Sequence, residues 1–146
     1  MSRTHIDILI AEDNDDDVVM LREAFAKVEY STILNVVKDG EEALIYLRRQ
    51  GRYKDSKQPD ILLLDINMPK KNGFEVLKEI KSDQRLQNLP VTMLTSSNEE
   101  EDIARSYSEG ACSYLIKPVN FSDFQKLIER FEIYWTLVSR VPFPRN

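Results

Sequence analysis

The sequence predicts an α/β fold in which strands and helices alternate along the chain around a parallel sheet. Five short runs rich in Ile, Leu and Val recur along its 146 residues, and segments with helical spacing of apolar residues lie between them. Alternation of this kind implies right-handed crossovers, parallel strands and helices on both faces of the sheet. At 17.0 kDa and 42% hydrophobic residues, the chain has the size of one globular domain.

The predicted strands are the continuous apolar runs at 6–11, 33–38, 61–66, 91–96 and 113–117. Continuous apolar runs are typical of strands that are covered on both faces. The connection 48–60 is polar and contains Gly51 and Pro59. We expect it to be a surface loop, because it is longer than most links in this architecture.

Each predicted helix has an apolar stripe that would lie on the sheet. The fifth pattern continues to Val138 and ends before Pro142 and Pro144, because proline does not continue a helix. The stripes are Val18, Leu21, Phe25 and Val28; Ala43, Leu44 and Leu47; Phe74, Leu77 and Ile80; Ile103, Ala104 and Tyr107; and Phe121, Phe124, Leu127, Ile128, Phe131, Trp135 and Val138.

Composition excludes several function classes. With one Cys (Cys112) and one His (His5), the chain cannot form an internal disulfide or a zinc site of Cys and His ligands. Hard cations held by oxygen, such as Mg²⁺, are the metals to expect. A net charge of −5 argues against direct nucleic-acid binding. No apolar run has the length of a membrane span, and we expect a cytoplasmic protein.

The first predicted strand ends in Glu12 and Asp13, and four more oxygen-bearing side chains follow at 14–17. One interpretation is helix capping by Asn14 or Asp15, with the next acids stabilised by the helix dipole. Capping does not account for Glu12 and Asp13, which continue an apolar strand. Acids in that position need a cation or hydrogen bonds as compensation, so a metal site is the second interpretation.

The third predicted strand also ends in an acid, Asp65, shortly before Pro69. Asp65 alone is compatible with a simple turn. If the first and third strands are neighbours, however, Glu12, Asp13 and Asp65 converge at one edge of the sheet. Three carboxylates so close together repel one another unless a divalent cation lies among them. Mg²⁺ is therefore the expected cofactor.

The fourth and fifth strands carry Thr95 and Lys117 to the same edge, where ligands bind in open parallel sheets. Taken singly, the hydroxyls from Thr95 to Ser97 are compatible with a helix cap, and Lys117 with a solvated lysine. Together with the acids they make a complete site for phosphoryl transfer to an aspartate. Asp65 would attack phosphorus, while Thr95 and Lys117 would contact the phosphoryl oxygens.

These motifs resemble the receiver domain of response regulators in two-component signalling. The resemblance covers about 6–131 and rests on the order and spacing of five motifs, which leaves 132–146 as a C-terminal extension of one receiver domain spanning 1–146. It implies a flavodoxin-like (βα)5 doubly wound sandwich with strand order 2-1-3-4-5 and an extended C-terminal helix. The motifs are ILIAED at 8–13, LLLDINMP at 62–69, Gly73, PVTMLT at 90–95 and GACSYLIKP at 110–118.

The resemblance also implies a role for each site residue. Asp65 would be the phosphoacceptor, assisted by Thr95 and Lys117. Thr95 and Tyr114 would form the switch pair, although Tyr114 is also compatible with plain strand core. Asn67 and Ser97 would tune dephosphorylation. The metal ligands would be Asp13, Asp65, the Asn67 backbone carbonyl and Glu12 through a water molecule.

The C-terminal extension suggests how such a protein would signal. Ile133 and Leu137 point away from the apolar stripe of the last helix, so they either pack under the tail or form a homodimer or partner surface with Tyr134. The long helix, the Tyr134-Trp135 pair and the 48–60 loop resemble single-domain regulators of phytochrome kinases. This resemblance implies a sensor histidine kinase of the phytochrome-like type as phosphoryl donor. The donor is expected on another protein, because His5 lies at the chain start and not on a helix face.

Three other functions remain open at this stage. The first is an intermediate carrier in a phosphorelay. The second is a Mg²⁺-dependent phosphohydrolase that works through an aspartyl phosphate, although Asn67 stands where a second acid is expected. The third is an FMN carrier, although acids stand where a phosphate loop is needed. A receiver is otherwise expected to catalyse only its own phosphorylation and dephosphorylation.

Overall fold

A computed structural model describes residues 5–28 and 31–133. Its centre is a five-stranded parallel sheet in the order β2-β1-β3-β4-β5, so the predicted doubly wound fold and its strand order are confirmed. The predicted strand ends are correct to within two residues. The strands are β1 (His5–Ala11), β2 (Ser31–Val37), β3 (Ile61–Leu64), β4 (Val91–Thr95) and β5 (Ser113–Ile116).

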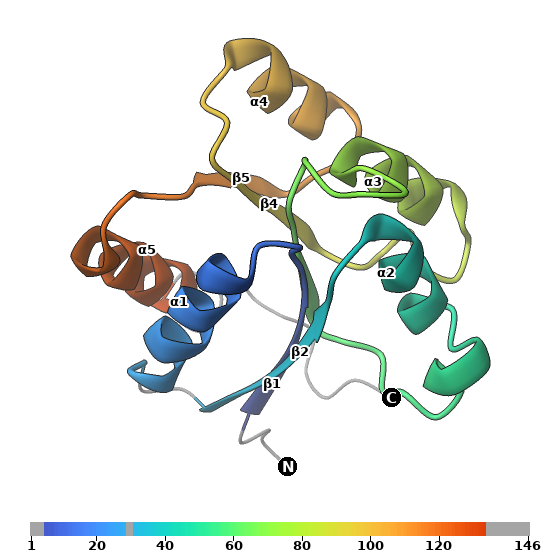
Figure 1. The fold of residues 1–146 in the computed structure, drawn as a ribbon. Helices are drawn as coiled ribbons and strands as arrows, with labels where there is room; N and C mark the ends of the chain where they lie inside the picture. The colour runs from blue at the N-terminus through green and yellow to red at the C-terminus, as the bar shows by residue number, and fades with distance from the viewer. Residues whose placement is uncertain (1–4, 29–30, 134–146) are drawn as a thin grey trace.

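Helices cover both faces of the sheet (Figure 1). α1 and α5 lie side by side on one face, while α2 and α3 lie together on the other, with α4 next to α3. The Arg105 guanidinium of α4 lies 4.1 Å from the centre of the Phe74 ring of α3. The helices are α1 (Asp15–Ala26), α2 (Gly40–Leu47), α3 (Gly73–Ser82), α4 (Glu100–Ser108) and α5 (Phe121–Ile133).

The core has two parts, one on each face of the sheet. Alternate residues of β1 point to opposite faces: Ile8 and Ile10 pack with α1 and α5, whereas Leu9 and Ala11 pack with α2 and α3. β3 and β4 are buried along their whole length, as predicted. The edge strands β2 and β5 are only partly covered, so the prediction of full burial was wrong for them. An edge strand has a neighbour on one side only, and its outer side chains remain accessible.

The apolar stripes of α1, α2, α3 and α5 face the sheet as predicted. The stripe predicted for α4 was wrong, because Ala104 and Tyr107 are exposed and Ser106 is the buried residue. α4 covers the edge of the sheet near β5 and has little apolar surface beneath it. The Ser106 hydroxyl is satisfied within the helix, where it donates to the Asp102 carbonyl at 2.7 Å.

The connection 48–60 is more ordered than a simple surface loop. It contains a short 3₁₀ turn, η1 (Gly51–Tyr53), and the Tyr53 ring packs against Tyr46 with 4.9 Å between ring centres. The Tyr53 hydroxyl also lies at 2.5 Å from the Glu42 carboxylate. These contacts fix the start of the connection against α2.

The described part of α5 buries Phe124, Ile128 and Phe131, and Ile133 at its end is 47% exposed. Tyr134, Trp135, Leu137 and Val138 lie outside the described residues, so the predicted continuation of this helix stays a prediction. Within residues 5–28 and 31–133, no helix has the length and apolar character needed to cross a membrane.

The register of the sheet brings the strand ends together. Ala11 of β1 is level with Leu64 of β3, and Thr95 of β4 is level with Ile116 of β5. Residues that follow these strands therefore emerge at one edge. They are Glu12 and Asp13 after β1, Asp65 after β3, and Lys117 after β5, beside Thr95 at the end of β4.

Candidate functional site

The acids that end β1 and β3 meet at the carboxyl edge of the sheet. Glu12, Asp13 and Asp65 each place a carboxylate oxygen within 4.8 Å of the others. The Asp65 backbone N–H donates to the Ala11 carbonyl at 3.1 Å, which continues the ladder between β1 and β3 and sets the two strand ends level. Glu12 and Asp65 are buried and Asp13 is exposed, so the cluster opens to solvent on the Asp13 side.

Glu12 is an acid in a place where ionisation is costly. It is 2% exposed, and burial raises its pKa to about 7, even though a hydrogen bond from Lys117 acts in the opposite direction. The charge of Asp65 also raises the pKa of Glu12, while the Asn14 backbone N–H, which donates to Glu12 at 3.1 Å, lowers it. A positive charge at this cluster would therefore be stabilising.

Lys117 provides such a charge. Its side chain is 6% exposed, so a solvated lysine, the simplest alternative, was wrong. The ammonium donates to Glu12, to Asp17 at 2.8 Å and to Asp65 at 3.2 Å. Burial acts to lower the pKa of Lys117, but the contacts with Asp17 and Glu12 outweigh it and raise the pKa. Lys117 is therefore a charged group directed at Asp65.

Asp17 is the site residue that the sequence did not reveal. The two interpretations of the acidic run both hold in part: Asn14 caps α1, with its side chain accepting from the Asp17 backbone N–H at 3.0 Å, while Glu12 and Asp13 belong to the acid cluster. The Asp17 carboxylate contacts Lys117, in addition to its favourable interaction with the dipole of α1. Only the folded structure, which brings the first turn of α1 next to the residue that follows β5, shows this contact, because the two residues are 100 positions apart.

The donor set of the acid cluster fits a hard divalent cation. Three carboxylates, two of them buried, supply the oxygen ligands that Mg²⁺ and Mn²⁺ prefer. Repulsion among the carboxylates favours a bound cation. Asn67 is exposed in the loop that follows β3.

Three further residues lie next to this cluster: Thr95 at the end of β4, Ser97 in the β4–α4 connection and Tyr114 in β5. The Thr95 side chain is fully buried, and its hydroxyl accepts weakly from the Ser97 N–H at 3.5 Å. The Ser97 hydroxyl donates to Asp102 at 2.6 Å, and the Tyr114 hydroxyl donates to the Ser97 carbonyl at 2.8 Å. Tyr114 is half-buried, and burial raises its pKa. These bonds tie α4 and β5 to the loop beside Asp65.

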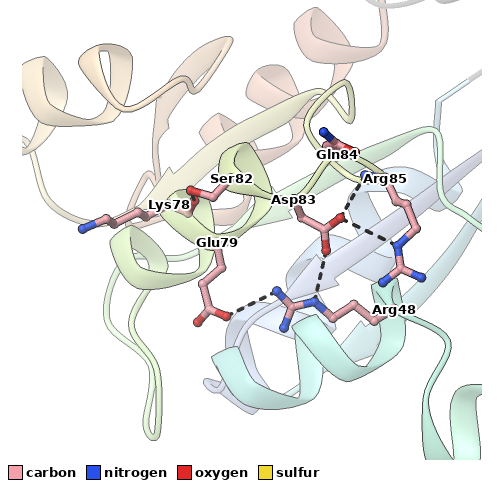
Figure 2. Close-up of a pocket in the computed structure, with 7 residues that line it drawn as sticks. All are labelled: Arg48, Lys78, Glu79, Ser82, Asp83, Gln84 and Arg85. Atoms are coloured by element: carbon pink, nitrogen blue, oxygen red, sulfur yellow. Dashed lines mark hydrogen bonds and ion pairs between the residues drawn. The ribbon is translucent and has the colours of Figure 1, made fainter.

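A separate cavity of about 660 Å³ lies between the carboxyl ends of α2 and α3 (Figure 2). Because the helices run antiparallel to the strands, their carboxyl ends lie near the amino ends of the strands, away from the acid cluster. Most of the charged groups that line the cavity are paired with one another: Arg48 contacts Glu79 and Asp83, each at 3.3 Å, and Arg85 contacts Asp83. We interpret the ion pairs around this cavity as contacts that hold α2 and α3 together.

Comparison with known proteins identifies the architecture. Residues 8–129 match the family model of the response regulator receiver domain. The chain is 38% identical over 138 residues to the probable methanogenesis regulatory protein FilR2 of Methanothrix harundinacea, covering 94% of this chain and 88% of the relative. It is 36% identical over 135 residues to the response regulator Rcp1 of a Synechocystis strain, covering 92% of each chain.

Two solved structures are similar over nearly the whole chain. The phosphorylated cyanobacterial phytochrome response regulator RcpA superposes with a TM-score of 0.89 at 39% identity, covering 94% of this chain and 99% of that one. The Mn²⁺-bound form of Rcp1 superposes with a TM-score of 0.87 at 36% identity, with the same coverage. The chain is thus similar to a phosphorylated phytochrome response regulator, RcpA, and to a response regulator that holds Mn²⁺, Rcp1.

Proposed function

The chain belongs to the response regulator receiver domain family, and from this premise we propose that it is the phosphoacceptor of a two-component pathway. In this proposal Asp65 receives a phosphoryl group, and the modified protein changes its binding to itself or to a partner. The observation that carries the proposal is the convergence of Asp65 with Glu12, Asp13 and Lys117 at one sheet edge.

The proposed reaction is an in-line displacement at phosphorus. A carboxylate oxygen of Asp65 forms a P–O bond while the P–N bond of a phosphohistidine, or the P–O bond of acetyl phosphate, breaks. The electron pair of the broken bond stays on the leaving imidazole nitrogen or acetate oxygen, and the imidazole takes a proton from water. The chain would catalyse only this transfer and the hydrolysis of its own acyl phosphate.

The residues around Asp65 support this chemistry. Asp13, Asp65 and the Asn67 backbone carbonyl would hold Mg²⁺, and Glu12 would bind it through water. When bound, the cation neutralises charge on the phosphoryl oxygens. Lys117 is already charged and within 3.2 Å of Asp65, so it is suited to pair with a phosphoryl oxygen. Lys117 loses its ion pair with Asp65 when the Asp65 carboxylate becomes an acyl phosphate.

Thr95 and Tyr114 would carry the change away from Asp65. We propose that the Thr95 hydroxyl turns to the phosphoryl group and that the Tyr114 ring moves into the space this opens. The bond from Tyr114 to the Ser97 carbonyl links that ring to the loop. Asn67 and Ser97 flank the acceptor and would tune the lifetime of the acyl phosphate by placing the attacking water.

The donor proposed here is a sensor histidine kinase of the phytochrome-associated type, because relatives such as RcpA are named as phytochrome response regulators. We further propose one receiver domain over 1–146, with its core at about 6–131 and an extension at 132–146 that forms a homodimer or partner surface. Exposed Ile133 would belong to this surface, together with Tyr134 and Leu137 outside the described residues.

Mass spectrometry of the intact protein tests the acceptor. With acetyl phosphate and Mg²⁺ we expect one adduct of about 80 Da, the mass of a phosphoryl group added to a carboxylate. Asp65→Asn should not form it. Asp55→Asn is the matched control, since it removes an exposed acid outside the site, and it should be labelled like the wild type.

Two further readouts separate the possible outcomes. An adduct that forms only with a divalent cation and is released by hydroxylamine would identify an acyl phosphate at the acid cluster. An adduct that persists in Asp65→Asn would contradict the proposed acceptor. If no adduct forms with acetyl phosphate, beryllofluoride binding distinguishes a short-lived acyl phosphate from a site without this chemistry.

A further inference from the structure

We propose that Asp17, in the first turn of α1, is a positioning residue that holds the Lys117 ammonium against Asp65 for phosphoryl transfer. This inference rests on the proposed function and deepens it. It adds to the site an acid that lies outside the metal-binding cluster and acts through Lys117.

The contact between Asp17 and Lys117 is short and largely shielded from water. The carboxylate accepts from the ammonium at 2.8 Å, and the two side chains are 22% and 6% exposed. Surface ion pairs contribute little because water and salt screen them, but a charge-assisted hydrogen bond to a buried ammonium is stronger and directional. This contact therefore restricts where the ammonium lies.

Two rigid elements hold the partners in place. The Asp17 backbone N–H is fixed by the Asn14 cap of α1, and the Lys117 backbone N–H donates to the Thr95 carbonyl at 2.8 Å, directly after β5. The side chains thus meet from anchored backbones on either side of the acid cluster. The other acids of the same turn differ in their surroundings: Asp15 pairs with Lys38, and Asp16 is exposed.

The three acceptors of Lys117 are not equivalent once the site is loaded. Glu12 and Asp65 belong to the cluster that fits a divalent cation, whereas Asp17 does not. A bound cation draws on the carboxylate oxygens of Glu12 and Asp65, which Lys117 also contacts. Asp17 would then be the remaining anionic partner of the ammonium, and it would keep Lys117 from turning toward solvent before the phosphoryl group arrives.

The variants that test this are Asp17→Asn and Asp17→Glu, with Asp16→Asn as the matched control. Asp16→Asn removes the same charge from the same helix turn, so it reproduces the effect on the helix dipole. Asp17→Asn retains the backbone N–H that the Asn14 cap requires. Circular dichroism checks that each variant folds, and Asp17→Glu restores the carboxylate if the asparagine itself disturbs the turn.

The first readout is the rate of labelling with acetyl phosphate and Mg²⁺. Asp17→Asn should be slowed about tenfold, the factor expected from one lost charge-assisted hydrogen bond. Asp16→Asn should keep the wild-type rate, and Asp17→Glu should recover most of it. A wild-type rate in Asp17→Asn would overturn the proposal.

The second readout does not depend on phosphorylation. In protein labelled with ¹⁵N-lysine, a held ammonium exchanges its protons slowly and gives a distinct Nζ signal, which Lys117→Arg identifies by its loss. With Mg²⁺ present, the signal should persist in the wild type and in Asp16→Asn but broaden away in Asp17→Asn. If the wild type is neither labelled by acetyl phosphate nor able to bind beryllofluoride, the proposed function fails while this signal still decides the role of Asp17. An unchanged signal in Asp17→Asn would refute that role.

Discussion

Gly73, at the start of α3, shows how a residue without charge can control the site. A Cβ atom at this position would lie 2.3 Å from the Asp65 carbonyl oxygen and 2.8 Å from the Ile66 Cα. The Gly73 N–H also donates to the Ile66 carbonyl at 2.7 Å. The segment that carries Asp65 is thus pressed against the first turn of α3, and only glycine allows this approach.

We predict that Gly73→Ala impairs phosphorylation without altering any ionisable group. The added methyl must displace the backbone at Asp65, and overpacking of this kind costs about 1–3 kcal/mol in the free energy of unfolding. Urea unfolding and acetyl phosphate labelling measure the two effects.

Gly51→Ala is the matched control for this change. Its φ of +55° makes alanine unfavourable, yet a Cβ there would meet nothing within 4 Å. A cost of about 1–2 kcal/mol from the left-handed backbone, with normal labelling, is expected. Equal labelling by the Gly73 and Gly51 variants would show that the close approach to Asp65 has no functional effect.

The Tyr114 hydroxyl permits a second prediction at the level of one residue. Tyr114→Phe removes the bond to the Ser97 carbonyl but keeps the ring, so about 1 kcal/mol of stability should be lost. Amide hydrogen exchange should become faster in the loop 96–99 that follows β4. Tyr107→Phe, on the exposed side of α4, should leave this exchange unchanged. Exchange that stays slow in Tyr114→Phe would mean that other bonds hold the loop.

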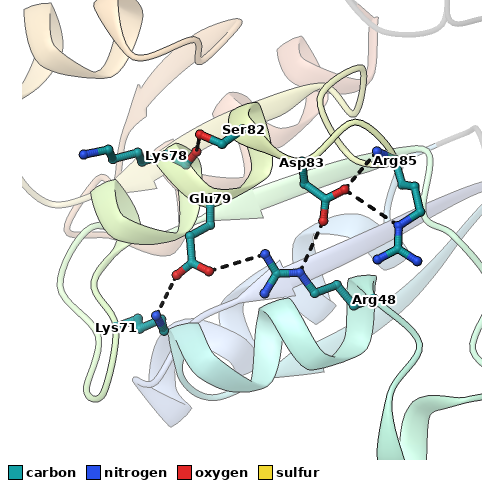
Figure 3. A network of polar contacts seen from close by, with 7 residues as sticks. All are labelled: Arg48, Lys71, Lys78, Glu79, Ser82, Asp83 and Arg85. Atoms are coloured by element: carbon teal, nitrogen blue, oxygen red, sulfur yellow. Dashed lines mark hydrogen bonds and ion pairs between the residues drawn. The ribbon is translucent and has the colours of Figure 1, made fainter.

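Between elements, a chain of ion pairs joins α2 to α3 (Figure 3). Glu79 accepts from Lys71 at 2.6 Å and from Arg48 at 3.3 Å, and Arg48 also reaches Asp83 at 3.3 Å. Lys71 lies in the loop between β3 and α3, which also carries Asn67. The network therefore connects the carboxyl end of α2 with the loop between β3 and α3, which begins at Asp65 of the acid cluster.

The network makes part of the stability dependent on pH. The Arg85 backbone N–H, and to a smaller extent Arg48, lower the pKa of Asp83 against an opposing effect of burial. An acid whose pKa is lower in the folded state stabilises the fold above its unfolded pKa, and this stabilisation is lost as pH falls through the folded value.

We accordingly predict that Asp83→Asn destabilises the protein at neutral pH and that the difference from wild type shrinks below about pH 4. Asp55→Asn, at an exposed acid of the 48–60 connection, should show neither effect. Urea unfolding at several pH values is the measurement. A difference that stays constant through acid pH would assign the effect of Asp83→Asn to packing instead of charge.

At the scale of whole elements, burial explains which sequence predictions succeeded. β1 and β3 were predictable because strands covered on both faces must be apolar throughout, which leaves Glu12 and Asp65 conspicuous at their ends. The helix α4 was also predicted, but its buried face was not, because α4 lies at the sheet edge and buries only Ser106. The partnership of Asp17 with Lys117 depends on the distance between α1 and β5 in space, and no local pattern encodes that distance.

Over the whole molecule, the acid cluster and the end of α5 lie at opposite ends of the sheet. α5 begins after Lys117 at the carboxyl edge and runs back toward the amino ends of the strands. Its last described residue, Ile133, is 47% exposed. The helix α5 thus joins the carboxyl edge to this surface, and its inner face packs on α1 through the edge-on contact of Phe131 with Phe25.

We predict that Ile133→Glu weakens self-association by at least about tenfold, because a carboxylate without a partner is costly to bury in an apolar contact. Ile116→Glu is the matched control: it introduces the same charge at a similarly exposed position, 42%, on β5. Sedimentation velocity with and without beryllofluoride measures association, and acetyl phosphate labelling should be normal in both variants. Since α5 packs on α1 and Ile116 lies at the sheet edge, loss of association only in Ile116→Glu would move the proposed surface from the end of α5 to the β5 edge. If the wild type stays monomeric both with and without beryllofluoride, self-association is not the output, and the surface would bind a different partner protein.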